Sequence, residues 1–404
     1  MLDLMHPCAR VIDAVTGESL TEDLISAAAD ALIGESVLIL PVEPTIASVA
    51  RYLAGLRLGK PVLLLDPAGS HNEFAPRFRT DDVHPELALL LATSGSTGNP
   101  KLVRLSRSAC LANAEQIAGA LDIGEDAVAI TTLPLFYSYG LSVLHSHLIS
   151  GATVVLERSG LMQRTFWNAV VEHRVTSLAL VPSQYEMLRR LRFDPSGYPA
   201  LRTLYQAGGR LRPDLVTDFA DRMATVDGAL HVMYGQTEAG PRMATLPPHR
   251  IADKPGSVGR ALAGGEFTVA DGEVVYRGPN VMMGYAESAA DLARGDELRG
   301  VLHTGDLGWL DDEGYLFLTG RLKRMAKVFG VRINLEDVER NFPVTAMAGD
   351  DKLVVFAESA DSALRYEIAD WLGTHPTGVV LRGVEALPLL PNGKVDYRAL
   401  EAML

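Results

Sequence analysis

Residues 93–101 read Thr-Ser-Gly-Ser-Thr-Gly-Asn-Pro-Lys and directly follow an apolar run, residues 87–92, that predicts a buried strand. Hydroxyl side chains, two glycines and a lysine this close together suit a cradle for phosphate oxygens, because glycine frees backbone N–H groups and the ammonium adds charge. The spacing differs from the Gly-x4-Gly-Lys-Ser/Thr loop of kinases and GTPases, since Pro100 stands where the second glycine would be. The stretch therefore indicates either a phosphate-binding loop or a flexible turn between two strands.

The composition is that of an acidic globular protein. The chain has 404 residues, 48% of them hydrophobic, which suits a large domain plus a smaller one. A net charge of −13 argues against a general nucleic-acid-binding protein. Two cysteines, Cys8 and Cys110, exclude a disulfide framework and favour a reducing compartment. The N-terminus lacks a signal-peptide pattern and no apolar stretch is long enough to span a membrane, so we expect a cytoplasmic protein.

Short apolar runs alternate with stretches long enough for helices over the first 250 residues. Apolar residues recur at helical spacing in residues 45–58, for example. The predicted strands are residues 37–41, 62–66, 127–131, 152–156, 177–181 and 201–205. This alternation predicts an α/β fold with parallel strands buried on both faces.

The composition and the hydrophobic pattern of the sequence change after residue 257. Glycines and short alternating segments, such as residues 272–278 and 314–319, predict an antiparallel, barrel-like region over residues 257–320. Beyond it, the sequence predicts a helix from Asn334, a strand at residues 353–356 and a helix over residues 362–372. We therefore expect a large N-terminal domain, 1–320, and a small α+β C-terminal domain, 321–404.

Four further segments accompany the loop at Thr93. They are Tyr-Gly-Gln-Thr-Glu-Ala-Gly at 234–240, His-Thr-Gly-Asp-Leu-Gly-Trp-Leu at 303–310, the basic segment 320–334, and Pro-Asn-Gly-Lys at 391–394. In order and approximate spacing, the five segments resemble the motifs of the adenylate-forming superfamily, which includes acyl- and aryl-CoA synthetases, peptide-synthetase adenylation domains and luciferases. The resemblance runs from about residue 20 to the C-terminus.

The resemblance implies a two-step reaction. ATP with Mg²⁺ activates a carboxylate as an acyl-adenylate with release of pyrophosphate, and the acyl group then passes to a thiol, that of CoA or of phosphopantetheine. Joining two anions requires cations and N–H donors around the phosphates, which the motif residues supply.

The resemblance also assigns roles to single residues. Tyr234 would stack on adenine, Thr237 would contact the α-phosphate, Glu238 would bind Mg²⁺, and Asp306 and Arg321 would hold the ribose. The alternatives, a core tyrosine for Tyr234 and a turn-capping aspartate for Asp306, are less favoured than these roles. The remaining nucleotide-binding residues implied are Thr93, Ser94, Gly95, Ser96, Thr97, Gly98, Lys101, Gly208, Gly209, Gly235 and Gln236.

The C-terminal domain would contribute the catalytic lysine. By the resemblance, Lys394 bridges the carboxylate, the α-phosphate and the ribose, Lys323 is the hinge, and Lys327 acts in one of two domain poses. Phe329 and Gly330, taken as a strand, would face the tunnel that admits the thiol. Without the resemblance, Lys394 is an exposed lysine of a turn.

The residues around Tyr137 bear on the acid. Peptide-synthetase domains that select α-amino acids place an Asp in the position of Tyr137, where it pairs with the substrate ammonium. Because Tyr137 cannot do so, we expect an aryl or acyl acid. The candidate pocket residues, which core packing explains equally well, are Tyr137, Tyr139, Tyr205, Ala207, Gly208, Val232, Met233 and Met243.

Only about 20 residues separate the strand at 62–66 from Glu86, where relatives place a further α/β unit. Loss of a unit would leave the catalytic motifs intact and remove a wall of the CoA groove. Three hypotheses follow: an acid–thiol ligase that uses CoA, a stand-alone adenylation enzyme that loads a carrier protein or an amine, and an inactive binding protein of the same fold.

Overall fold

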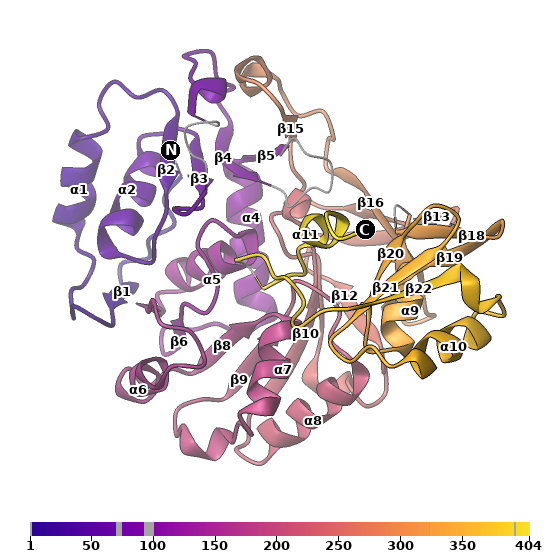
Figure 1. The fold of residues 1–404 in the computed structure, drawn as a ribbon. Helices are drawn as coiled ribbons and strands as arrows, with labels where there is room; N and C mark the ends of the chain where they lie inside the picture. The colour runs from indigo at the N-terminus through magenta and orange to yellow at the C-terminus, as the bar shows by residue number, and fades with distance from the viewer. Residues whose placement is uncertain (1, 70–74, 93–100, 323, 392) are drawn as a thin grey trace. The chain divides into compact units, whose positions relative to one another are not determined.

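The computed structural model describes residues 2–69, 75–92, 101–322, 324–391 and 393–404 (Figure 1). The chain forms two compact units, described separately here. The first contains Met1–Glu266 and Tyr276–Leu302, and the second contains Phe267–Val275 and His303–Leu404. The predicted domain boundary at residue 320 stays a prediction.

A mainly parallel sheet forms the centre of the first unit. Its strands follow the order β1-β7-β6-β8-β9-β10-β11-β12. The first six strands in this order are parallel, whereas β11 and β12 run antiparallel to their neighbours. The bounds are β1 Arg10–Asp13, β6 Val128–Ile130, β7 Thr153–Leu156, β8 Ser177–Leu180, β9 Thr203–Gln206, β10 Ala229–Tyr234, β11 Ala244–Leu246 and β12 Ser257–Ala261. The predicted α/β wiring is confirmed.

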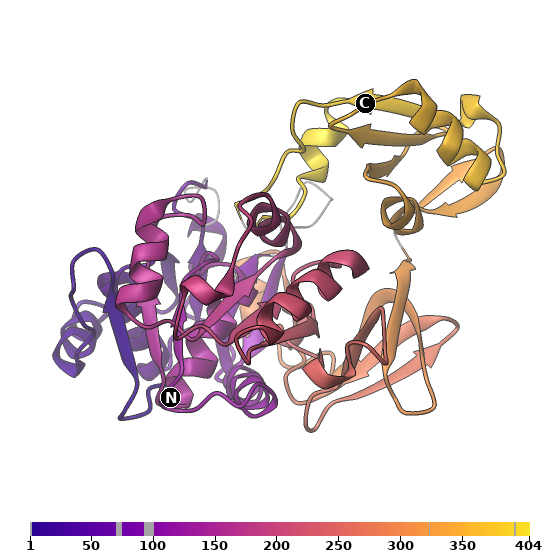
Figure 2. The ribbon, with the colours of Figure 1, turned by 90° about the horizontal axis from the view of Figure 1, so that it is seen from below.

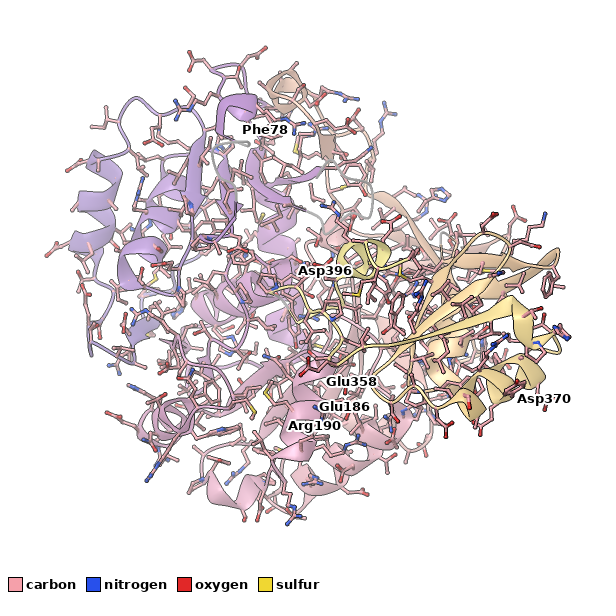
Figure 3. All side chains as sticks on the ribbon, in the orientation of Figure 1. Phe78, Glu186, Arg190, Glu358, Asp370 and Asp396 are labelled. Atoms are coloured by element: carbon pink, nitrogen blue, oxygen red, sulfur yellow. The ribbon has the colours of Figure 1, made fainter. Side chains whose placement is uncertain are left out.

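A second sheet of the first unit has the order β15-β5-β4-β3-β2. The bounds are β2 Leu38–Pro41, β3 Val62–Leu65, β4 Leu87–Ala92, β5 Leu102–Ser106 and β15 Gly284–Ala286. Strands β2, β3 and β4 are parallel, whereas β5 runs antiparallel to both β4 and β15. The connection of β3 to β4 contains the 3-10 helix η1 (Ala75–Phe78), whose Phe78 is fully buried (Figure 3).

Helices fill the space between these two sheets. Helix α2 (Ile46–Arg57) contacts β2, β3 and β1, and it begins at Thr45, whose hydroxyl accepts a hydrogen bond from the Ser48 amide. Helix α4 (Arg107–Ala120) contacts β4 and β5, helix α5 (Ser138–Ile149) contacts β6 and β7, and the two helices pack on each other. The sheets and helices share one apolar core.

Other helices cover the remaining faces of the first unit (Figure 1). Among them, α8 contacts β10, and α1 packs on α2. Their bounds are α1 Glu22–Asp30, α6 Arg164–Glu172, α7 Pro182–Arg190 and α8 Pro213–Ala224.

The second unit combines antiparallel strands with a small α+β domain. Its strands follow the orders β17-β16-β14-β13, β18-β19 and β20-β21-β22, and α10 lies along β22 (Figure 2). The bounds are β13 Glu266–Ala270, β14 Glu273–Arg277, β16 Val301–Leu310, β17 Leu316–Arg321, β18 Met325–Val328, β19 Val331–Asn334, α9 Leu335–Asn341, β20 Thr345–Ala348, β21 Leu353–Ala357, α10 Ser362–Trp371, β22 Val379–Gly383 and α11 Tyr397–Glu401. The antiparallel texture predicted after residue 257 and the helices predicted near 334 and 362 are confirmed.

Both cysteines are free thiols, Cys8 exposed and Cys110 buried. Within the described part of the chain, no helix combines the length and the apolar character that crossing a membrane requires.

Candidate functional site

Parallel strands of the large sheet end at one edge, and many of the predicted site residues of the first unit lie at or just after these ends. Residues 131–140 follow β6, Val181 follows β8, residues 207–209 follow β9, and residues 235–242 follow β10. The carboxyl edge of a parallel sheet is where α/β proteins bind ligands. The edge therefore gathers segments that lie more than a hundred residues apart in the sequence.

Thr237 is fixed at this edge by contacts on both sides. It opens the 3-10 turn η3 (Thr237–Ala239), and its Oγ1 lies 2.9 Å from Ser138 Oγ at the start of α5. The far side of the turn is held by Asn280, whose Nδ2 donates to the Ala239 carbonyl at 2.6 Å. Ser138 is buried and was not predicted from the sequence.

Glu238 and Lys101 come together across strand β15. Strand β5 begins directly after Lys101, and its register with β15 pairs Leu102 with Ala286. Lys101 therefore lies beside Glu287, with 2.7 Å between Nζ and Oε1, and its ammonium is 5.8 Å from the centroid of the Tyr285 ring. The hydroxyl of Tyr285 donates to Glu238 Oε1 at 2.9 Å.

Burial and the charge of Glu238 raise the pKa of Tyr285, so this phenol stays protonated as a donor at neutral pH. The predicted phosphate-loop residues that precede Lys101, namely Thr93, Ser94, Gly95, Ser96, Thr97 and Gly98, lie outside the described residues.

Most of the predicted acid-pocket residues share one cluster. Tyr139, Tyr205, Ala207 and Met233 are buried in it, with Tyr137 packed against them. The Tyr139 hydroxyl donates to the Tyr205 carbonyl at 3.0 Å, and the rings of Tyr137 and Tyr139 meet edge to face at 6.2 Å. Burial raises the pKa of Tyr137 to about 12, so its phenol is neutral at physiological pH.

Gly208 is conformationally required beside this cluster. Its φ is +80°, and a Cβ at this position would lie 2.7 Å from the Tyr137 hydroxyl and 2.9 Å from Val181 Cγ1. Gly208 therefore leaves the space in which Tyr137 sits.

The pleat of β10 separates the other pocket candidates. Val232 and Tyr234 point to the face opposite Met233, because side chains alternate along a strand. Val232, Tyr234 and Met243 are buried but lie outside the cluster around Tyr139. Their assigned roles stay predictions.

The remaining nucleotide candidates of the first unit make close backbone contacts. The Gly209 carbonyl accepts from Gln206 Nε2 at 2.7 Å. A Cβ on Gly235 would lie 1.8 Å from the Pro241 carbonyl oxygen, so only glycine fits where the chain folds back. Gln236 is the residue at which η3 begins.

The second unit brings Asp306 and Arg321 together. The register of β16 with β17 pairs the two residues, and 2.8 Å separates Arg321 Nε from Asp306 Oδ1. Asp306 is 3% exposed and Arg321 is half-exposed, with Glu336 Oε1 3.8 Å from the same Nε. Burial raises the pKa of Glu336, while Arg321 and Arg324 act to lower it.

Two of the predicted lysines of the second unit lie in a turn and in a strand. Lys394 is half-buried in a turn closed by its own carbonyl, which accepts from the Leu390 amide at 2.7 Å. Lys327 is exposed on β18, and Lys323 lies outside the described residues. Phe329 and Gly330, predicted as a strand, instead form the tight turn between β18 and β19, both with positive φ.

A family profile described as "AMP-binding enzyme" matches residues 16–286, more than half of the chain. The chain belongs to the AMP-binding enzyme family. Among curated members, a feruloyl-CoA synthase from Amycolatopsis is 34% identical over 323 residues, which cover 76% of this chain and 62% of that protein. A probable CoA ligase, CCL9, from Humulus lupulus is 32% identical over 271 residues, 63% of this chain and 50% of that protein. The chain spans about half of the length of such relatives, or somewhat more.

Solved structures of adenylate-forming enzymes share the fold. ATP-bound MatB from Rhodopseudomonas palustris matches with a TM-score of 0.78 and 22% identity over 98% of this chain and 96% of that chain. An o-succinylbenzoate-CoA synthetase from Bacillus subtilis, solved with an acyl-adenylate intermediate, matches with a TM-score of 0.76 and 21% identity over 97% of this chain and 94% of that chain. The predicted fold class is therefore confirmed.

The sequence did not reveal several polar residues at this edge: Ser138, Tyr285, His231 and Arg242. His231 pairs with Tyr205 across β10 and β9, its buried Nδ1 has no partner among the described residues, and burial lowers its pKa to about 4. Arg242 had one usable signal, a charged residue in the otherwise apolar stretch after the 234–240 motif. Ser138 and Tyr285 had none, because their partners lie 99 and 47 residues away.

Proposed function

We propose that this protein activates a carboxylic acid with ATP and Mg²⁺, releases pyrophosphate, and transfers the acyl group to the thiol of CoA. The observation that carries the proposal is the arrangement of Glu238, Tyr285 and Lys101. It places a carboxylate and an ammonium on neighbouring elements, with the ammonium at the end of the candidate phosphate loop.

The donor groups fit a magnesium–triphosphate substrate. Glu238 offers a carboxylate oxygen, the ligand type that Mg²⁺ prefers, and Tyr285 holds that carboxylate in place. The pair of Lys101 and Glu287 is about half-exposed on each side, so it contributes about 0–1 kcal/mol. Replacing Glu287 by a phosphate oxygen as the partner of the Lys101 ammonium therefore requires little free energy.

In the first step, a carboxylate oxygen of the acid attacks the α-phosphorus, and the bond from that phosphorus to the bridging oxygen of pyrophosphate breaks. Lys101 and Glu238 with its metal would hold the leaving pyrophosphate, and Thr237 would donate to the α-phosphate. Asp306 would accept the ribose hydroxyls, and Lys394 would neutralise charge where the two anions meet. In the second step, the thiol attacks the acyl carbonyl and AMP leaves.

The cluster around Tyr137 supports an acid without an α-ammonium group. Tyr137 offers a neutral phenol here, and the apolar residues packed with it, such as Tyr139 and Met233, offer no negative charge to pair with an ammonium. An ammonium bound there would be buried without a counter-ion, which costs several kcal/mol. We therefore propose an aryl or acyl acid as substrate.

The test is pyrophosphate exchange across a panel of carboxylic acids with wild type, Glu238→Gln and Lys394→Ala. We expect exchange with at least one aryl or acyl acid and a loss of about 100-fold or more in each variant, the usual scale for removing a transition-state charge contact. Exchange by Lys394→Ala at the wild-type rate, or no exchange with any acid, would refute the proposal.

The acceptor is tested with the best acid. Addition of CoA should produce a thioester detectable by mass spectrometry. Formation of a thioester only on a pantetheinylated carrier protein would instead assign the protein to carrier loading.

A further inference from the structure

Arg242 is buried at the carboxyl edge of the large sheet and is held by its backbone. It lies between η3 and β11 with a relative exposure of 3%. Its amide donates to Asn113 Oδ1 at 3.1 Å, and its carbonyl accepts from Asn113 Nδ2 at 2.8 Å and Asn280 Nδ2 at 2.9 Å. The side chain is therefore directed by a fixed backbone.

The guanidinium of Arg242 has no counter-ion among the described residues. Within the described part of the chain, its side chain makes one hydrogen bond, a long one of 3.4 Å from Nη2 to Ser142 Oγ, and its buried Nε has no partner. Its carbon Cζ lies 4.5 Å from the centroid of the Tyr139 ring. A desolvated cation–π contact offsets only part of the cost of burying an unpaired cation, so the site favours an anion.

The groups that face this guanidinium leave its charge uncancelled. The Tyr139 ring lies beside it and Tyr137 packs edge to face on Tyr139, and burial raises the pKa of both phenols, so they are neutral at physiological pH. Arginine itself stays protonated in proteins. The edge near Tyr139 therefore carries one net positive charge.

Helix α5 links Arg242 to Thr237, because each of these two residues contacts a serine of the helix. Ser138 contacts Thr237, the residue proposed to meet the α-phosphate, and Ser142 contacts Arg242. The two serines are four residues apart on α5, about one helical turn of 5.4 Å. An acid whose reacting carboxylate lies at Thr237 would bring a second group a few bonds away to Arg242.

We propose that Arg242 binds a second carboxylate on the acid substrate, and that the substrate class is therefore short dicarboxylic acids. The inference rests on the proposed acid activation. A bidentate contact between the guanidinium and the distal carboxylate would supply the missing counter-ion and would use the unpaired Nε.

The test compares acids that differ only at the distal end: butanoate with succinate, pentanoate with glutarate, and hexanoate with adipate. For wild type, we expect kcat/KM for pyrophosphate release to be at least 100-fold higher for the diacid of one pair. In Arg242→Leu this preference should fall at least 100-fold or reverse, because a distal carboxylate would then be buried without a partner. Arg242→Lys should keep part of the preference.

Arg222→Leu is the matched control. Arg222 also lies over an aromatic ring, with Cζ 5.5 Å from the Phe219 centroid, but it pairs with Asp218 at 2.9 Å. Its removal should leave the diacid preference unchanged. Binding gives a second readout without chemistry: diacids should raise the melting temperature of wild type and not that of Arg242→Leu.

Three results would overturn the inference. Wild type could prefer the monocarboxylic acids, Arg242→Leu could keep the diacid preference, or Arg242→Leu could lose activity equally with both members of each pair. The last result would place Arg242 on the reacting carboxylate or in a purely structural role. Failure of all acids to support pyrophosphate release would refute the proposed function instead.

Discussion

Two buried arginines in the first unit, Arg104 and Arg242, have opposite surroundings. Arg104, on β5, is fully buried, and its Nη2 lies 2.6 Å from Glu297 Oε2. Its nitrogens also donate to carbonyls of residues 283, 285, 294 and 295. The side chain of Arg242, also buried, makes one long hydrogen bond and has no carboxylate partner among the described residues.

The comparison separates a structural from a functional guanidinium. The partners of Arg104 are all within the protein, so its charge is used in holding β5, β15 and the segment near Glu297 together. The folded chain leaves most hydrogen-bond donors of the Arg242 guanidinium without an acceptor. A buried donor without an acceptor lowers the stability of the protein unless a ligand supplies one. Four predictions follow from this difference, in order of decreasing effect on stability.

Arg104→Met should have the largest effect, a loss of about 3–5 kcal/mol in the free energy of unfolding, because it leaves four backbone carbonyls without this donor, while Glu297 keeps Arg294 as an ion-pair partner. Urea denaturation followed by circular dichroism would measure it. The double variant Arg104→Met with Glu297→Leu should recover part of the loss. A single variant as stable as wild type would break the comparison.

Gly284→Ala should cost about 1–3 kcal/mol by the same measurement. Gly284 pairs with Arg104 across β15 and β5, its φ is +137°, and a Cβ there would lie 2.3 Å from Glu297 Oε2. Ala286→Gly, on the same short strand, is a comparison for strand weakening alone. If Gly284→Ala and Ala286→Gly lose equal stability, the close approach of residue 284 to the Arg104–Glu297 ion pair does not contribute to the loss.

Tyr285→Phe should cost about 1 kcal/mol through the lost hydrogen bond to Glu238. Because the Tyr285 carbonyl also accepts from Arg104 Nε, this residue joins the Arg104 network to the proposed metal carboxylate. We expect the KM for ATP–Mg²⁺ to rise several-fold while kcat changes less. An unchanged KM would show that the phenol does not position Glu238.

Arg242→Leu should have the smallest effect and the opposite sign. Without ligand, its free energy of unfolding should equal that of wild type or exceed it by up to about 1 kcal/mol, since an unpaired buried charge is removed. Thermal unfolding in buffer free of carboxylic acids would test this. A loss comparable to that of Arg104→Met would mean that Arg242, too, is structural.

The sequence predicted the elements better than it predicted these contacts. The apolar runs at 62–66 and 152–156 became β3 and β7, because continuous apolar segments of strand length identify strands buried on both faces. The sequence did not predict the buried ion pair of Arg104, because an arginine inside a strand is normally interpreted as a solvent-facing residue. Its partner Glu297 lies 193 residues away. Pairing at that distance is decided by the tertiary fold.

Local conformation also limited the site prediction. Phe329 and Gly330 read as part of a strand, but both adopt positive φ in a hairpin turn, which is rare for a bulky residue such as Phe329. Val232 and Met233 were assigned to one pocket, yet the pleat sends them to opposite faces of β10. Consecutive residues of a strand face opposite ways in any register, but which of the two faces the cluster around Tyr139 depends on how β10 packs in the fold.

The pairing of β5 with β15 has a consequence for synthesis. Arg104 and Tyr285 are 181 residues apart, so a growing chain presents the outer edge of β5 long before its partner strand emerges from the ribosome. Until then, the edge is open to pairing with another chain, and the Arg104 guanidinium has none of its later acceptors. Assembly of Lys101, Tyr285 and Glu238 must therefore wait for β15, which makes the candidate nucleotide site a late product of translation.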